Sequence, residues 1–514
     1  MPDQTRNQWA GVAITMFAAF GGILYGYDTG VISGVIVMKN WLETFGTDPK
    51  GDGNFVISSS TESLVVSILS AGTFFGALAS GYTADWLGRR WPFFKSNVFS
   101  TGVAMQTAST AIPLFVVGRV FAGFGVGVTS TVVPSDAPKW IRGAVVSLYQ
   151  WCITIGLLLA AVVNNATKDR PDHSSYRITI GIQFIWAFIL ATGIYLLPES
   201  PRWLIRHGDM DRAVVSLSKL TGLSSTDPEL ELELEDIKAS LAQELALGET
   251  SVIDCFRSSE NKIRLRTLTG IFIQAWQQLT GINFIFYYGT TFFAASGISN
   301  PFLVTVATNV VNVGMTLPGT WAIERFGRRK LLLIGAAGMC VCEFIVAIVG
   351  VSVTTSNLTG QHVLIAFVCI YIAFFASTWG PIAYVVISEI FPLQVRAKAM
   401  AMSSASNWLW NFGIGYATPF LVNNVQGSAG LEVKVFFIWG STCLCCFIFA
   451  YFCVPETKGL TLEQIDLMYQ HTTPLTAGPY RARLIAENIH VSQTTKATPD
   501  DVNSEGHGSA DEKV

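Results

Sequence analysis

Charged residues are scarce in this sequence. Asp, Glu, Lys and Arg together make up 13% of its 514 residues, whereas a soluble domain normally carries about a quarter. Half of the residues are apolar, and the mean hydropathy is +0.44. The net charge is only −3, and no basic tract is long enough to bind nucleic acid. The composition therefore excludes an ordinary soluble domain and predicts a protein embedded in the lipid bilayer.

Signatures of catalysis and metal binding are missing as well. The six histidines are scattered without a pair at metal-ligand spacing, and the sequence contains neither a nucleophile elbow nor a phosphate-binding loop. Eight of the nine cysteines lie in apolar runs, where they act as small packing residues, and only Cys255 lies in a polar stretch. These absences argue against a membrane enzyme and predict no metal and no cofactor.

Long apolar segments dominate the chain. A helix needs about 20 apolar residues to cross the hydrocarbon core, so the segments between charges are counted as candidate spans. The N-terminus has no cleavage-site pattern, and its apolar run is read as a retained first span. We predict twelve spans, at residues 11–37, 63–84, 96–114, 115–134, 144–165, 178–197, 267–290, 302–323, 331–352, 363–388, 399–422 and 435–454.

Lysines and arginines predict the orientation of these spans. They follow the second, fourth, eighth and tenth spans, for example at Arg89, Lys139 and Arg329. The positive-inside rule makes that side cytoplasmic, so both termini are predicted to be cytoplasmic. The glycosylation sequons at Asn165 and Asn357 then fall outside, where glycosylation takes place.

Two segments lie outside the spans. The long loop between spans six and seven mixes leucine with glutamate at helical spacing over residues 227–249, which predicts short cytoplasmic helices. Beyond about Thr472, serine, threonine, glycine and charge predict disorder. The predicted organisation is a cytoplasmic N-terminus at 1–10, six-helix halves at 11–197 and 267–454, a helical linker at 198–266, and a mostly disordered cytoplasmic tail at 455–514.

Three short signatures occur twice, about 240 to 257 residues apart. The recurring pairs are residues 81–90 and 319–329, 135–143 and 388–397, and 198–202 and 455–459. A parallel duplication of this kind predicts two homologous six-helix halves, with a substrate site near the membrane midplane between them.

Each repeated signature joins an acid to arginines at a cytoplasmic helix end. We interpret these groups as ion pairs that hold an inner gate shut and break as the halves rock. Positive-inside anchoring alone explains the arginines but not the paired acids. The predicted gate residues are Asp85, Arg89, Arg90, Asp136, Arg142, Glu199, Glu324, Arg328, Glu389, Arg396 and Glu456.

Uncharged amides occur within several apolar spans. An amide both donates and accepts hydrogen bonds without carrying charge, which suits a ligand with several hydroxyl groups. Hydrogen bonding between helices is the alternative role for any single one of them. The candidates are Gln150, Gln277, Gln278, Asn283, Asn312, Asn407 and Asn411.

An acidic residue lies within the first span, at Asp28. A carboxylate at mid-bilayer costs about 2.5–3.5 kcal/mol on insertion scales, so an intramembrane acid indicates function. Arg119 in the fourth span is the expected partner, because both residues lie in the outer half of the membrane; a static buried ion pair is the alternative. Glu343 in the ninth span is a second intramembrane acid, for which the sequence indicates no role.

The repeated signatures, arriving in order on the expected spans, resemble those of the sugar porter family of the major facilitator superfamily, and within it the fungal hexose transporters. The similarity extends over about residues 11–470. It implies the major facilitator fold, with twelve transmembrane helices in two six-helix repeats and short cytoplasmic helices between them. It also implies transport of a hexose such as glucose by alternating access, in the plasma membrane. We expect a monomer, because the site lies between halves of one chain.

The resemblance also implies roles for individual residues. Two positions depart from the usual pattern: Tyr384 stands where span ten usually has tryptophan, and Tyr25 stands where phenylalanine is usual. Tyr384 still offers an aromatic face and adds a hydroxyl, so it bears on sugar preference and not on the class of ligand. The positions that bind sugar or line its site in the family match Gln150, Gln277, Gln278, Asn283, Asn312, Tyr384, Asn407 and Trp408.

Proton coupling is implied by the same resemblance. In proton-coupled sugar porters the acid at the position of Asp28 accepts the proton, and the arginine at the position of Arg119 sets its proton affinity. Some fungal relatives retain the acid yet are passive facilitators, and others are non-transporting sensors with long cytoplasmic tails. We expect a transporter, because the tail after Pro455 has only about 60 residues and no repeated motif.

Overall fold

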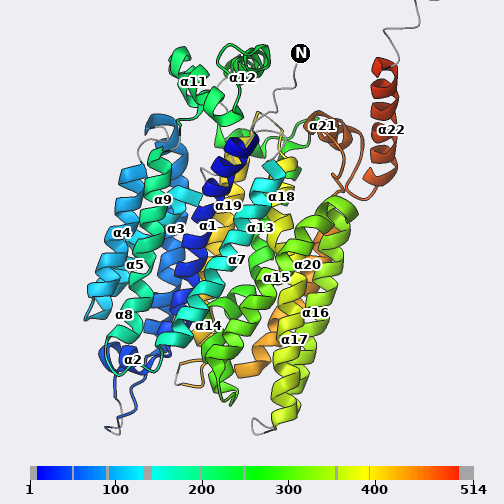
Figure 1. Cartoon of the computed structure of the whole chain (residues 1–514). Coiled ribbons are helices and arrows are strands. Elements are labelled where there is room, and N and C mark those ends of the chain that lie inside the picture. The colour runs from blue at the N-terminus through cyan, green and yellow to red at the C-terminus, as the bar shows by residue number, and fades with distance from the viewer. Residues whose placement is uncertain are drawn as a thin grey trace, which may run out of the picture.

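A computed structural model of the chain describes residues 8–48, 51, 53–87, 92–130, 142–196, 198–246, 251–353, 357–392, 394–425 and 427–496. Regular structure in these ranges is helical, apart from one isolated bridge between Thr47 and Val56. Figure 1 shows long helices packed side by side in a bundle. A helix satisfies its own backbone hydrogen bonds, as a membrane-spanning segment must. The predicted all-α class is confirmed.

The first six predicted spans correspond to helices of the N-terminal half. The third ends six residues earlier than predicted, because the Ser109 hydroxyl turns back onto the Gln106 carbonyl (2.7 Å) and a new helix begins at Ile112. The short helix α2 (Lys39–Phe45) follows the first span on the side away from the N-terminus (Figure 1). The spans are α1 (Gln8–Val35), α3 (Ser59–Leu87), α4 (Pro92–Ala108), α5 (Ile112–Ser130), α7 (Arg142–Thr167), and the pair α8 (Ser174–Gly181) and α9 (Gln183–Leu196).

The other six predicted spans form the C-terminal half. Two of them are divided into two helices each, the seventh at Gly281 and the tenth at Thr378. The helices are α13 (Ile263–Leu279), α14 (Ile282–Ala295), α15 (Pro301–Phe326), α16 (Arg328–Ser352), α17 (Leu358–Ser377), α18 (Trp379–Glu389), α19 (Arg396–Val422) and α20 (Val435–Cys453), with a 3-10 turn η2 (Glu432–Lys434) before α20.

Hydropathy alone identifies fewer spans than these. Within the described ranges, seven helices are long and apolar enough to cross a membrane, or eight if α1 and α2 form one span bent by 81°. Spans three and four fail this test because α4 and the apolar part of α5 are short, and span seven fails because α13 and α14 are each too short by themselves. Span eleven fails as well, and α19 carries polar side chains such as Asn407 and Asn411.

The loop between the halves is helical, as the sequence predicts. Its elements are α10 (Pro201–Arg206), α11 (Met210–Thr221), α12 (Pro228–Ala246) and the 3-10 turn η1 (Val252–Phe256). Leu204, Leu217 and Leu230 join α10, α11 and α12 in a small apolar core of their own. Figure 1 shows these helices at the same end of the bundle as the N-terminus, and we call this end the inner side.

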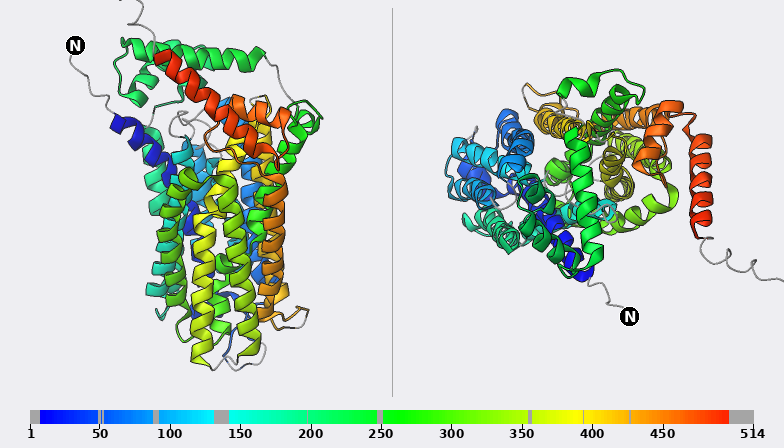
Figure 2. Two further views of the ribbon diagram at one scale, coloured as in Figure 1. Left: turned by 90° about the vertical axis from the view of Figure 1, so that its right-hand side faces the viewer. Right: turned by 90° about the horizontal axis from the view of Figure 1, so that it is seen from above.

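The C-terminal segment differs from the expectation of disorder beyond Thr472. Two helices, α21 (Leu462–His471) and α22 (Ala477–Lys496), lie on the inner side (Figure 2). Ala477 and Leu484 are buried, and Arg481 Nε donates to the Lys458 carbonyl at 2.7 Å. These contacts join α22 to the preceding part of the chain, and composition alone does not reveal them.

Close packing between α1 and α7 depends on glycine. A Cβ on Gly26 would lie 2.0 Å from the Ile153 carbonyl oxygen, and a Cβ on Gly156 would lie 2.3 Å from that of Ile23. Small residues of this kind allow helices in a membrane to approach closely and gain van der Waals contact. The first span, which carries Asp28, is therefore held tightly against the fifth, which carries Gln150.

The break in span seven is supported by neighbouring helices. Gly281 has φ +84°, in the left-handed region that favours glycine. The carbonyl groups freed at the end of α13 are satisfied by the Thr442 hydroxyl, which donates to Leu279 O at 2.6 Å, and by the Tyr371 hydroxyl, which donates to Thr280 O at 2.7 Å.

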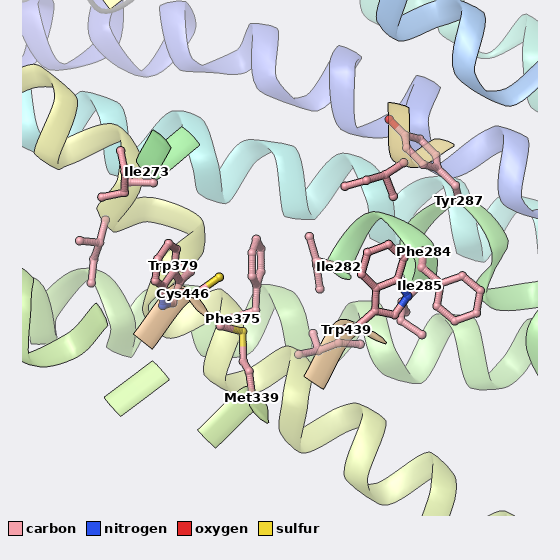
Figure 3. Packing of buried hydrophobic residues seen from close by; sticks show 14 of the residues in the cluster. Ile273, Ile282, Phe284, Ile285, Tyr287, Met339, Phe375, Trp379, Trp439 and Cys446 are labelled. Carbon is pink, nitrogen blue, oxygen red and sulfur yellow. The ribbon is translucent and has the colours of Figure 1, made fainter. Parts of the chain in front are cut away.

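Buried apolar side chains behind the break form the core of the C-terminal half. Figure 3 shows Phe284 and Ile285 packed near Trp439, and Phe375 near Met339. This core packs against both parts of span seven.

Candidate functional site

The three predicted amides of span seven lie on both sides of its break. Gln277 and Gln278 belong to the end of α13 and Asn283 to the first turn of α14, and all three are buried. Asn283 Nδ2 donates to Gln278 Oε1, although the two residues are five apart. A continuous helix turns positions five apart to different faces, so the break brings these two amides together.

Gln277 is held by two further helices. Its Nε2 donates to the carbonyls of Trp379 and Gly380, at 3.0 and 2.8 Å, at the start of α18. Its Oε1 accepts from Asn407 Nδ2 of α19 at 2.8 Å. Asn407 Nδ2 also donates to Gln274 Oε1 at 2.7 Å. The predicted residues Gln277 and Asn407 are therefore in direct contact.

Asn411 links this group to the N-terminal half. Its Nδ2 donates to Gln278 Oε1 at 3.2 Å, and its Oδ1 accepts from the Tyr287 hydroxyl at 2.8 Å and from the Ser70 hydroxyl at 2.6 Å. Ser70 belongs to α3. We call the hydrogen-bonded side chains Gln274, Gln277, Gln278, Asn283, Asn407 and Asn411 the amide network.

Aromatic side chains accompany the amide network. Trp408 meets Tyr25 of α1 edge to face, with ring centroids 5.2 Å apart and an interplanar angle of 83°. Tyr384 of α18 and Gln150 of α7 are half-buried, and Gln150 Nε2 lies 3.7 Å from the position that a Cβ on Gly380 would take. The site is thus composed of neutral polar and aromatic groups from both halves.

Asn312 stands apart from the other predicted amides. It is buried on α15, and its Nδ2 has no hydrogen-bond partner. Among the described residues, no side-chain hydrogen bond joins it to the amide network. The sequence therefore identifies Asn312 as a candidate, and the structure leaves its donor free.

Asp28 and Arg119 are both buried and close enough to interact electrostatically. Neither carboxylate oxygen of Asp28 has a hydrogen-bond partner, nor do Nε and Nη2 of Arg119. Gln183, at the start of α9, also faces Asp28 and is fully buried. Sequence reasoning missed Gln183 because a single glutamine in an apolar run forms no motif.

Glu343 lies behind the break in span seven. It is 1% exposed, its carboxylate oxygens have no hydrogen-bond partner, and Oε1 lies 3.1 Å from the position that a Cβ on Gly281 would take. Nothing in the sequence indicates this proximity.

Several predicted gate residues meet on the inner side of the C-terminal half. Arg328 Nη2 contacts Glu389 Oε1 at 2.8 Å and Glu324 Oε1 at 3.3 Å. Glu456 accepts from the backbone N–H groups of Arg328 and Arg329, at 2.9 and 3.1 Å. A carboxylate is favourable at this place, because the N-terminus of α16 carries partial positive charge. These contacts join helices of one half.

The remaining predicted gate residues make other contacts or lie outside the described residues. Arg396 donates to the Phe391 carbonyl through Nε and Nη2, and Glu199 is buried and accepts from the Ser200 N–H group. The predictions for Arg89, Arg90 and Asp136 and for the side chains of Asp85 and Arg142 lie outside the described residues.

The two sequons differ in accessibility. Asn165 lies within helix α7, half-buried and with a buried Oδ1, whereas Asn357 is exposed at the N-cap of α17. An oligosaccharide is bulky and needs a surface position. Asn357 therefore meets this requirement better than Asn165.

Comparison with known proteins agrees with this architecture. The family model for "Sugar (and other) transporter" matches residues 14–469. A major facilitator-type transporter of Aspergillus rugulosus is 48% identical over 91% of this chain and 89% of its own length, and a probable glucose transporter of Neurospora crassa is 44% identical over 91% and 81%. A high glucose sensor of Saccharomyces cerevisiae is 42% identical over 91% of this chain and 62% of the sensor.

Solved structures give the same fold. The proton:xylose symporter XylE of the major facilitator superfamily, from E. coli, bound to 6-bromo-6-deoxy-D-glucose, superposes with a TM-score of 0.73 at 27% identity, covering 90% of this chain and 100% of that chain. These findings confirm the twelve-helix major facilitator fold. The relatives and structural neighbours are transporters and not enzymes, as the sequence predicts. This multi-pass membrane protein belongs to the sugar transporter family of the major facilitator superfamily.

Proposed function

We propose that this chain carries a hexose across the membrane by alternating access of its two halves, in symport with a proton. The observation that carries the proposal is the buried amide network, in which Gln277, Gln278 and Asn407 hydrogen-bond to one another without a charged group. The similarity to a probable glucose transporter and to a proton:xylose symporter supports it.

A sugar fits this network because one of its hydroxyl groups can take the place of an amide group as a hydrogen-bond partner. Gln278 Oε1 accepts from both Asn283 and Asn411, so a hydroxyl can displace one donor and leave the other in place. Exchanging one neutral hydrogen bond for another costs little free energy, whereas an unsatisfied buried donor costs about 1–3 kcal/mol. Trp408 and Tyr25 offer apolar surface for the C–H groups of the ring.

Asp28 is the proposed proton acceptor. Arg119 at close range favours the ionised carboxylate, and its withdrawal favours the protonated acid. In the proposed cycle, Asp28 is protonated while sugar is bound, and it is ionised and paired with Arg119 when the site is empty.

The inner contacts of Arg328 with Glu324 and Glu389 join helices of the C-terminal half, so their proposed effect is to hold that half together while it moves against the other. Residues 11–197 and 267–454 are the proposed moving halves. Residues 1–10, 198–266 and 455–514 are the proposed cytoplasmic segments of a monomeric plasma-membrane protein, and Asn357 is the better of the two proposed glycosylation sites.

Two other functions are compatible with the amide network. The high glucose sensor is 42% identical, so a sugar-binding protein that does not transport is the second candidate. A passive hexose facilitator is the third, since it needs the amide network but not proton transfer at Asp28.

Reconstitution into liposomes separates these candidates. A transporter exchanges labelled glucose by counterflow, and a sensor does not. Among transporters, a symporter accumulates glucose against its gradient when a proton gradient is applied, and Asp28→Asn should abolish this accumulation while counterflow continues. Normal counterflow after combined Gln277→Leu, Gln278→Leu and Asn283→Leu would place the sugar site elsewhere.

A further inference from the structure

The hydroxyl group of Tyr287 lies between the two parts of the proposed mechanism. Tyr287 is buried on α14, and its hydroxyl donates to Asn411 Oδ1 at 2.8 Å. The side chain points away from Phe284 and Trp439 in the C-terminal core (Figure 3). It is also close enough to Arg119 and Asp28 of the N-terminal half to interact electrostatically with both.

Arg119 lacks hydrogen-bond acceptors for part of its guanidinium group. Nε and Nη2 are buried without a partner, which costs more for a charged donor than for a neutral one. The Tyr287 oxygen still has lone pairs, because its hydrogen atom is used toward Asn411. The tyrosine oxygen therefore keeps an acceptor position, and Arg119 keeps buried donors, within electrostatic range of each other.

We propose that Tyr287 is a positioning residue that passes the protonation state of Asp28 to the sugar site through Asn411. When Asp28 takes up a proton, Arg119 donates to the Tyr287 oxygen instead. Hydrogen bonds in a chain polarise one another, so this contact strengthens the bond from Tyr287 to Asn411 and favours one arrangement of Asn411 and Gln278. By reciprocity, bound sugar then raises the proton affinity of Asp28.

Other ionisable groups also surround this cluster. Tyr25 of α1 and Tyr288 of α14 are within electrostatic range of Tyr287. Tyr288 is also within range of Arg119 and of the buried Glu62 carboxyl group of α3. The Tyr288 hydroxyl donates to the Gly415 carbonyl at 2.7 Å and makes no side-chain bond to the amide network among the described contacts. Tyr288 is therefore the matched control, one residue from Tyr287 on the same helix.

The inference rests on the proposed proton symport, and the test treats the two separately. Full-length wild type, Tyr287→Phe and Tyr288→Phe are reconstituted, and the glucose KM of each is measured at acidic and at neutral pH, with counterflow and with accumulation driven by a proton gradient.

Tyr287→Phe is expected to reduce the pH-dependent change in glucose KM by about fivefold, the equivalent of about 1 kcal/mol at 1.4 kcal/mol per tenfold. Accumulation should fall with it, while counterflow continues at a reduced rate. Tyr288→Phe should keep the pH dependence of the wild type.

Four results overturn the inference. Tyr287→Phe with the full pH dependence of the wild type, or without any counterflow, shows that its hydroxyl does not serve as a relay. An equal loss of pH dependence in Tyr288→Phe shows a general disturbance of the site. A wild type that never accumulates glucose overturns proton symport and the relay together, whereas failure of the relay alone leaves wild-type accumulation intact.

Discussion

The Ser70 hydroxyl donates a hydrogen bond to Asn411 Oδ1 over 2.6 Å. Ser70 belongs to α3 of the N-terminal half and Asn411 to α19 of the C-terminal half, and both are buried. Asn411 also donates to Gln278 in the amide network. A rearrangement of the halves at this level therefore changes the hydrogen bonding of the sugar site directly.

Gln278→Leu is expected to raise the KM for glucose about tenfold or more. The substitution removes the amide to which a sugar hydroxyl is proposed to bond, and a buried polar group of the bound sugar left without a partner costs about 1–3 kcal/mol. Counterflow in liposomes measures the effect. Gln106→Leu is the control, because this buried glutamine of α4 donates within its own helix, to Gly102 O. An equal rise in KM in both variants would contradict a specific role for Gln278.

Gly281→Ala is expected to destabilise the protein and slow transport. An alanine at φ +84° carries about 1–2 kcal/mol of backbone strain, and its Cβ would lie 2.6 Å from Trp439 Cγ. Gly289→Ala on the same span is the control, since the nearest atoms to its Cβ are 3.7 Å away. Thermal unfolding in detergent and the maximal rate of counterflow measure both effects. Equal melting temperatures for the two variants would argue against backbone strain at the break in span seven.

Arg328→Ala is expected to lower stability and the maximal transport rate while leaving the glucose KM within about twofold. The side chain is 9% exposed and pairs with Glu389, which is 22% exposed, so the loss should be smaller than the about 3–5 kcal/mol typical of breaking a fully buried pair. Arg325→Ala is the control, because Arg325 is exposed and stacks on Trp321. A large rise in KM would place Arg328 at the sugar site instead.

Asp466→Ala is expected to loosen α21 from the inner end of span seven. Arg266 is fully buried, pairs with Asp466 and lies 4.1 Å from the centre of the Tyr469 ring. A hydrogen bond to a charged group contributes about 1.5–3 kcal/mol, so the melting temperature should fall. Leu467→Ala, at an exposed position on α21, is the control. If Asp466→Ala melts at the temperature of the control, this contact does not anchor the helix.

Much of the fold was predictable because membrane spans follow from composition. The uncharged stretch from residue 267 to 323 predicts spans seven and eight, and leucine and glutamate at helical spacing predict α12. Lipid imposes helical structure on any long apolar segment, so these elements need no tertiary information. The end of α4 was not predictable, because a local contact of the Ser109 hydroxyl decides it. The helix α22 was not predictable either, because its contacts with the preceding part of the chain are tertiary.

For the site, the sequence by itself determined which side chains are polar within apolar helices, and so it named Gln277, Gln278, Asn283 and Asn407. Only the tertiary structure decided that Asn411 joins Ser70 and Tyr287 to these amides, and that Gln183 faces Asp28. The physical reason is that a hydrogen bond between residues more than 100 positions apart depends on the rotation and axial shift of each helix, which packing sets and local sequence does not.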